Sequence, residues 1–172
     1  MTKITQLSIP NHLARKIYPN THPDLRQIMD ASFPAGFFKE LDFRDYTSFA
    51  QVCEAAGVDM KSFKLTADST EKEIRRVGQD MEELLYELFN DGTVMDYDNS
   101  NQKKWVNWYQ KNPGSGFSLY AVDFVNTFSL VGARLSAKSQ EIGRHIGTYF
   151  IDIVNMRMAG KVSTAILNML NQ

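Results

Sequence analysis

Cysteine is nearly absent from this chain, since Cys53 is the only one among 172 residues. A single cysteine excludes an internal disulfide framework and a zinc site built from several cysteines, and it fits a reducing compartment. Histidine is scarce too, and His12, His22 and His145 do not stand at metal-ligand spacing from one another or from Cys53. We therefore expect neither a metal nor a cofactor.

Long apolar runs are also missing. Gly, Asn and Asp interrupt the apolar stretches well before the roughly 20 residues that a membrane-spanning helix needs. Residues 1–10 lack the apolar core of a signal peptide. We therefore expect no membrane partner.

The chain has no large excess of one charge. Its formal net charge is -1, so nothing global marks it as a nucleic-acid binder, although a basic stripe can lie within a neutral total. Glu82 and Glu83 are interpreted as a solvated helix face. At 172 residues, one domain with a real core is expected.

Proline is rare after residue 34, and residues 1–23 hold Pro10, Pro19 and Pro23. Each proline favours an extended conformation in the residue before it. The same segment carries apolar residues that a disordered tail would lack: Ile4, Leu7, Ile9, Leu13, Ile17 and Tyr18. Two interpretations stay open, an extended arm that docks on another surface and an irregular segment packed on its own core.

Helical patterns dominate the rest of the chain. A short helix is predicted over 24–29, and another over Ser48–Ala56, capped by Asp45 or Thr47 and ended by Gly57. A capping box formed by Thr70 and Glu73 opens a long helix to about Asn90. Further helices are expected over 103–111 and 136–158, and an amphipathic turn or helix over 162–170.

The most apolar stretch, Phe117–Phe128, is predicted to be a central core helix, because its apolar residues recur at spacings of three and four. Asp123 lies in its middle. A charge in such a place must be paired or hydrogen-bonded. The sequence allows an internal arginine partner or an arginine-lined ligand site.

No strand alternation is apparent, so the expected fold class is all-α. We divide the chain into an N-terminal arm over 1–23, an all-helical core over 24–158 and a C-terminal extension over 159–172.

No constellation of residues favours an enzyme. Gly114-Ser115-Gly116 lies between two expected helices and is interpreted as a turn rather than a phosphate loop. Cys53 has no nearby base in the sequence and is interpreted as a small core residue. We therefore predict that the protein is not an enzyme.

Basic and aromatic residues alternate between Lys103 and Lys111. Lysines that neutralise phosphate and rings that stack on bases together bind single strands. The alternative is that Trp105 and Trp108, three apart on one helix face, anchor a core. On the last long helix, Arg144 and Arg157 flank the apolar stripe, where they would line a groove.

Four landmarks of a known family occur in the family's order over about residues 45–145. The stretch Val106–Phe124 has an Asn-Trp followed by a segment ending in Asp-Phe, Ile74-Arg75-Arg76 opens a helix, and Ser48–Gly57 lies upstream. This arrangement resembles the coat proteins of flexible filamentous plant RNA viruses, especially the potexvirus-like group.

The resemblance implies a coat protein that polymerises helically around single-stranded RNA, found in the virion and the host cell cytoplasm. Its residues 1–23 would dock on a neighbouring subunit. The family's arginine and aspartate hold one flipped nucleotide and correspond to Arg75 and Asp123, with Arg76 adjacent.

Two more family positions match with a shift. The family's pocket serine is carried over to Ser62, because Val58 and Asp59 occupy the expected place. A later family lysine is carried over to Arg144. Two rivals stay open: another nucleoprotein-like RNA-binding protein, and an all-α interaction module in which Arg75 and Asp123 form a buried ion pair.

Overall fold

The computed structural model describes residues 9, 11–34, 37–38, 42–127 and 133–171. In chain order its main elements are α1 (Asn11–Ile17), α2 (Pro23–Ser32), α3 (Phe49–Ala56), α4 (Glu71–Phe89), β1 (Lys104–Asn112), β2 (Gly116–Val125), α5 (Gln140–Tyr149), α6 (Ile151–Ala159) and α7 (Thr164–Leu170). Single 3-10 turns lie at Tyr18–Asn20, Phe43–Asp45, Met60–Ser62 and Ala133–Leu135.

The prediction of an all-α fold is wrong, because β1 and β2 form a two-stranded antiparallel sheet. This hairpin replaces both the helix expected over 103–111 and the described part of the helix expected over Phe117–Phe128. Residue 128 lies outside the described residues. Gly114 in the turn between the strands and Gly116 at the start of β2 both have positive φ, a conformation that residues with a Cβ rarely adopt.

A β-bulge explains why the sequence resembled a helix. The pairing runs from Trp108↔Ala121 to Tyr109↔Leu119, so Tyr120 is an extra residue in β2. The bulge changes the spacing of same-side residues in β2, and Leu119 and Val122, three apart, both contact glycines of α5. Strict alternation is thereby lost, and the spacing of three mimics a helical stripe.

The helix expected over 136–158 is two helices. Phe150 ends α5 and precedes α6 with φ −115 and ψ 26, outside the helical region. The N-cap is Ser139, whose side chain accepts from the N–H of Ile142.

Helix ends elsewhere follow the sequence. The Thr70 hydroxyl accepts from the Glu73 N–H, and the Glu73 carboxylate accepts from the Thr70 N–H at 2.7 Å, which confirms the capping box of α4. These bonds lower the pKa of Glu73. Gly57 ends α3 in the left-handed conformation as predicted, but the cap at its start is Ser48.

The N-terminal segment is not wholly extended. Residues 11–20 form α1 and a 3-10 turn, Ala14 is fully buried, and α2 begins at Pro23. Residues 1–8 and 10, which carry the rest of the predicted arm, lie outside the described residues. At the other end, Ile166 and Leu170 of α7 belong to the core cluster, so the C-terminal segment packs on the core.

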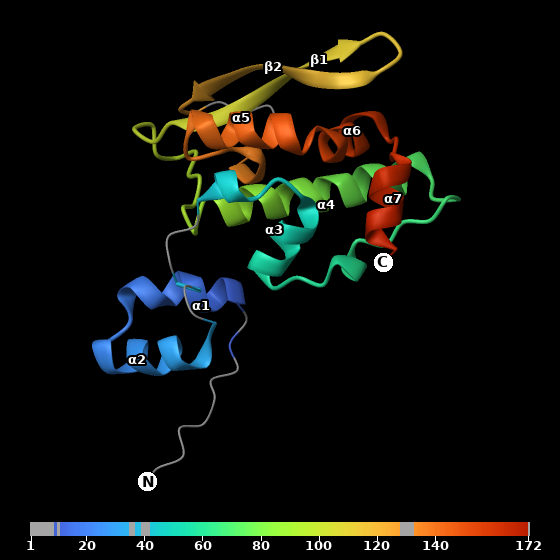
Figure 1. Ribbon diagram of the computed structural model, residues 1–172. Helices are drawn as coiled ribbons and strands as arrows, with labels where there is room; N and C mark the ends of the chain where they lie inside the picture. The colour runs from blue at the N-terminus through green and yellow to red at the C-terminus, as the bar shows by residue number, and fades with distance from the viewer. Residues whose placement is uncertain (1–8, 10, 35–36, 39–41, 128–132, 172) are drawn as a thin grey trace.

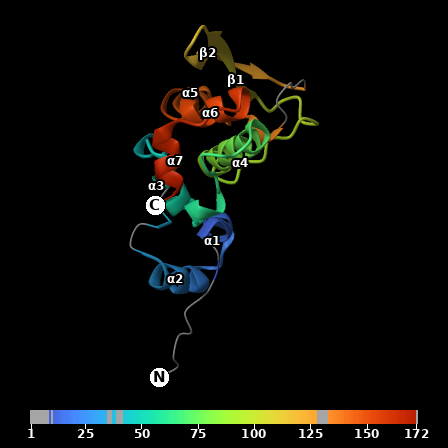
Figure 2. The same cartoon turned by 90° about the vertical axis from the view of Figure 1, so that its right-hand side faces the viewer.

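The elements stack in layers (Figures 1 and 2). The hairpin covers one side of α5 and α6, α4 lies on their other side, and α3 lies below α4. The pair α1–α2 lies at the far end from the hairpin, with α1 packed against α3. Glycines allow the layers to approach: a Cβ on Gly78 would lie 2.6 Å from the Arg157 backbone nitrogen, and one on Gly143 would lie 2.8 Å from Val122.

No described helix is long and apolar enough to cross a membrane.

Candidate functional site

The two central residues of the expected nucleotide pocket lie in different layers. Arg75 on α4 hydrogen-bonds the Met158 carbonyl and lies 3.5 Å from the Glu71 carboxylate. Asp123 lies on β2, exposed to solvent, and its Oδ1 accepts from the N–H of Phe124 at 2.8 Å. The α5–α6 layer lies between the two strands and α4 (Figure 1).

The other carried-over residues are dispersed as well. Arg76 is exposed on α4, Ser62 is exposed in a 3-10 turn, and Arg144 is exposed on α5. Among the described residues, no hydrogen bond or ion pair joins any two members of the expected pocket, which are Ser62, Arg75, Arg76, Asp123 and Arg144. The expected placement of Asp123 in a core helix is wrong, and the structure forms no Arg75–Asp123 pair.

A buried carboxylate does exist, but it is Glu82. Its side chain is 1% exposed, and it accepts from Arg157 Nε at 2.5 Å and Nη2 at 3.4 Å. The interpretation of Glu82 as a solvated residue is therefore wrong. Burial raises the pKa of Glu82, and the nearby Arg157 guanidinium opposes that rise.

This pair continues into a buried polar network that reaches the hairpin. Tyr86, one turn after Glu82, hydrogen-bonds Tyr109 of β1. The Tyr109 hydroxyl accepts from Asn107 Nδ2 at 2.9 Å, and the same amide donates to the Gly143 carbonyl at 2.7 Å. Burial raises the pKa of both tyrosines, which therefore stay protonated. The network joins α4, α5, α6 and β1.

The network is structural rather than reactive. Glu82 and Tyr86 are closed off from solvent, Tyr109 is half-buried, and hydrogen bonds link polar side chains of the network. One atom is left over, because the buried Asn107 Oδ1 has no hydrogen-bond partner among the described residues. Sequence reasoning missed Glu82, although it shares the buried stripe of α4 with Gly78, Met81 and Leu85. A helical projection that included charged residues would have placed it there.

The outward side of the hairpin has the opposite character. Trp108 is 45% exposed and Tyr120 is 73% exposed. The two tryptophans therefore differ, since Trp105 packs against the core cluster and stacks edge-on with Phe124 at 5.3 Å between ring centroids. Lys103 Nζ lies 4.5 Å from the centroid of the Phe124 ring.

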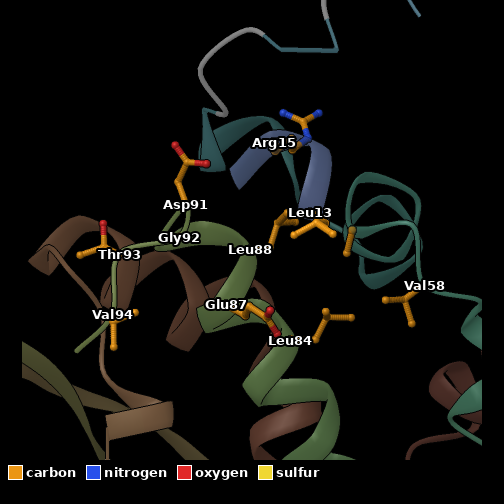
Figure 3. A pocket seen from close by; sticks show the side chains of 11 residues that line it. Leu13, Arg15, Val58, Leu84, Glu87, Leu88, Asp91, Gly92, Thr93 and Val94 are labelled. Atoms are coloured by element: carbon orange, nitrogen blue, oxygen red, sulfur yellow. The ribbon is translucent and has the colours of Figure 1, made fainter. Parts of the chain in front are cut away.

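A groove of about 520 Å³ lies between α1 and the core (Figure 3). Its apolar walls include Leu13 of α1 and Leu84 and Leu88 of α4, and Glu87 and Asp91 add negative charge. Figure 3 shows Leu13 facing Leu88, while the Arg15 guanidinium points away from Leu84. That guanidinium lies 4.4 Å from the Phe37 ring centroid. The groove is thus open and largely apolar.

Within the described ranges, no group of three or more His, Cys, Asp or Glu side chains is placed to hold a metal ion. Cys53 is buried, and burial raises the pKa of its thiol to about 11, so it is a poor nucleophile at neutral pH.

No protein-family model, curated protein or solved structure matches the chain.

Proposed function

We propose that this protein self-associates and coats single-stranded RNA, as the structural protein of a filamentous virion assembled in the host cytoplasm. The observation that carries the proposal is the apolar groove beside α1, which packs against α3 and leaves Leu13 exposed along the groove. An element with this geometry suits attachment to a second copy of the chain.

The groove supports self-association through its chemistry. Apolar side chains of α1, α3 and α4 line it, and Leu13 and Val94 leave 41% and 72% of their surface exposed. Exposed apolar patches of this kind mark interaction sites. The segment that precedes α1 carries Ile4, Leu7 and Ile9, so the same segment of a neighbouring subunit has the apolar side chains to cover the groove.

RNA binding is supported by the resemblance and by the distribution of charge. Residues 103–125 hold three lysines (Lys103, Lys104 and Lys111) and one acid, Asp123, in a chain of net charge -1. Of these lysines, Lys103 and Lys111 are exposed and would neutralise phosphate, whereas the Lys104 side chain is fully buried. A coat that tolerates any sequence needs phosphate contacts and pockets open to every base.

Negative-stain microscopy and sedimentation of the purified protein, with and without RNA, test the proposal. We expect elongated particles when single-stranded RNA is added. Monodisperse globules under every condition would contradict it.

A truncation sharpens this experiment. Removing residues 1–10 keeps α1 and its buried Ala14, so the core should stay folded while assembly is lost. A variant that still assembles fully would rule out the N-terminal segment as the assembly element.

A second candidate is a protein-docking module without nucleic acid, which the same apolar groove favours. It predicts self-association or partner binding with no measurable affinity for RNA, even at low salt, where phosphate contacts are strongest.

A further inference from the structure

We propose that the free edge of strand β1 pairs with β1 of a second copy of this chain, so that the two hairpins join into one continuous antiparallel sheet. The proposal goes beyond the proposed function, because it requires neither RNA nor the apolar groove beside α1.

The hairpin has two edges, and side chains already cover the edge of β2. Asn155 of α6 pairs with Phe117 as a strand would, because its Oδ1 accepts from the Phe117 N–H at 2.7 Å and its Nδ2 donates to the Phe117 carbonyl at 3.2 Å. Gln140 of α5 donates to the Val122 carbonyl at 3.1 Å. The Phe124 N–H donates at 2.8 Å to the carboxylate of the residue before it. At these positions β2 has no backbone group left for a further strand.

The edge of β1 is covered only at its beginning. The Trp105 N–H donates to the Ala137 carbonyl at 2.9 Å, and the Ala137 N–H donates to the Trp105 carbonyl at 2.7 Å. The backbone groups of Trp105 therefore point away from β2. Alternation along the strand directs those of Asn107, two residues later, to the same edge.

Two more residues of β1 turn their backbone groups to this edge. Lys111 is opposite Phe117, whose N–H and carbonyl point away from β1 toward Asn155. Opposite residues of an antiparallel pair direct their backbone groups either both toward or both away from each other, so those of Lys111 and of Tyr109 point away from β2. Among the described residues, no backbone group outside the hairpin pairs with Asn107, Tyr109 or Lys111.

This edge is also accessible. The α6 helix packs on β2, and α5 contacts β2 more than it contacts β1. The hairpin is the outermost layer on its side of the molecule (Figure 1). Trp108, Gln110 and Lys111 along the open stretch are exposed. An exposed row of unpaired N–H and carbonyl groups is matched by the backbone of another extended strand.

The open stretch of β1 is complementary to itself, which favours a second copy as the partner. It is bounded by Trp105, whose backbone groups are already paired, and by Pro113, which has no N–H. Its middle residue is Tyr109. When two β1 strands meet antiparallel with Tyr109 opposite Tyr109, Asn107 of each lies opposite Lys111 of the other, and every open N–H meets an open carbonyl.

The side chains fit this register. Trp108 of each strand lies opposite Gln110 of the other, on the outward side of the sheet. The indole, 45% exposed in one copy, can then pack along the aliphatic part of the glutamine. Lys111 lies opposite the uncharged Asn107, so no two like charges face each other across the new pair.

Amide hydrogen exchange, followed by NMR on the full chain at low and high protein concentration, tests the pairing. The N–H groups of Tyr109 and Lys111 should exchange roughly tenfold or more slowly once the dimer forms, because each then donates to a carbonyl. The Trp105 N–H is the internal control, since Ala137 already accepts from it. Exchange of Tyr109 and Lys111 that is independent of concentration would overturn the proposal.

Cysteine cross-linking tests the register. A Trp108→Cys chain mixed with a Gln110→Cys chain should form a disulfide-linked dimer under mild oxidation, because opposite residues lie within reach of a disulfide. Either variant alone should cross-link far less, since diagonal neighbours are about 7–8 Å apart. Wild-type protein, whose only cysteine is the buried Cys53, gives the background. Equal cross-linking in all mixtures would contradict this register.

A proline at the edge tests the backbone bonds. Lys111→Pro removes an N–H that points away from β2, so the β1–β2 ladder keeps its bonds. In sedimentation equilibrium the variant should dimerise roughly tenfold more weakly, because symmetry removes two hydrogen bonds. Lys111→Gln keeps the N–H and should dimerise like the wild type. Unchanged dimerisation of a folded Lys111→Pro chain would contradict the pairing.

The chain that lacks residues 1–10 separates this proposal from the proposed function. It should still dimerise and protect the Tyr109 and Lys111 amides. A monomeric truncated chain would show that the N-terminal segment makes the contact, which overturns the proposal. If the full chain assembles on RNA while these amides stay unprotected, the proposal fails and the proposed function survives. If the dimer forms but RNA yields no elongated particles, the proposed function fails and the proposal stands.

Discussion

The two sides of the hairpin use neighbouring residues for opposite purposes. Asn107 and Tyr109 face inward and join a buried network with Tyr86, whereas Trp108, between them, is exposed. The inward side fastens the strands to the helices, and the outward side is free to meet a partner. Alternation along a strand therefore separates residues needed for folding from residues available for binding.

Among the substitutions considered, Arg157→Met in the buried network should cause the largest loss of stability. The substitution leaves Glu82 buried without its partner, which typically costs about 3–5 kcal/mol. Urea unfolding should show this loss in the free energy of unfolding.

The matched control is Arg134→Met, which breaks the exposed ion pair between Arg134 and Glu83. Its cost should stay below about 1 kcal/mol. Equal losses in the two variants would contradict the central place of the buried pair. The double variant Glu82→Leu with Arg157→Met should recover much of the loss, because it leaves no unpaired charge.

Gly143→Ala should have the next largest effect. The added Cβ would lie 2.8 Å from Asn107 Oδ1 and from a Val122 methyl, so the hairpin would be pushed away from α5. Overpacking costs about 1–3 kcal/mol, reduced by up to about 1 kcal/mol because alanine favours a helix over glycine. Thr148→Ala, exposed on the same helix, should show no such loss in thermal or urea unfolding.

Stability should also respond to pH through His145, a buried residue of α5 outside the hairpin. Its ring lies among Phe43, Phe89 and Phe150, and its Nε2 bonds the Tyr46 carbonyl at 2.7 Å. Burial lowers its pKa from 6.5; the Tyr46 bond and the Asp42 charge oppose this shift, and Arg44 adds to it.

The lowered pKa of His145 decides the direction in which stability changes with pH. A lowered pKa means that the unfolded chain takes up the proton first, so the contribution of His145 to stability is present above about pH 6.5 and is lost as the pH falls. His145→Gln should flatten that part of the curve of unfolding free energy against pH, whereas His22→Gln at an exposed position should not. If His145→Gln leaves the curve unchanged, the pH dependence of stability does not come from His145.

The smallest effect on stability should come from the outward side. Trp108→Ala should cost less than about 1 kcal/mol, because the ring is half exposed and lies outside the core cluster. Trp105→Ala, which removes a ring packed on that cluster, should cost several times more in the same urea titration. Similar losses would show that both tryptophans are structural.

Local signals in the sequence predicted the helix ends well. The capping box at Thr70 and the left-handed Gly57 depend only on residues close in the sequence, so the sequence pattern is enough to predict them. The hairpin was missed because the bulge at Tyr120 disturbs alternation and imitates helical spacing. The break at Phe150 was missed because the apolar stripe continues across it.

The candidate site was harder to predict because it depends on the layers. Arg75 and Asp123 were paired through a resemblance that assumed helices on both sides, but Asp123 lies on a strand beyond α5 and α6. The buried carboxylate that needs a partner in the core is Glu82, and its partner Arg157 is 75 residues away in the sequence. The exposed rings could be suspected from the alternation of lysines and aromatics, but separating Trp108 from Trp105 required the strand register.

The central claim of the proposed function is that the protein binds single-stranded RNA, and photo-crosslinking with a 4-thiouridine oligonucleotide tests it most directly. Mass spectrometry of the digested complex should recover crosslinked peptides of this chain, and an excess of unlabelled single-stranded RNA should compete for them. The absence of any crosslinked peptide from the folded protein at low salt would contradict the claim.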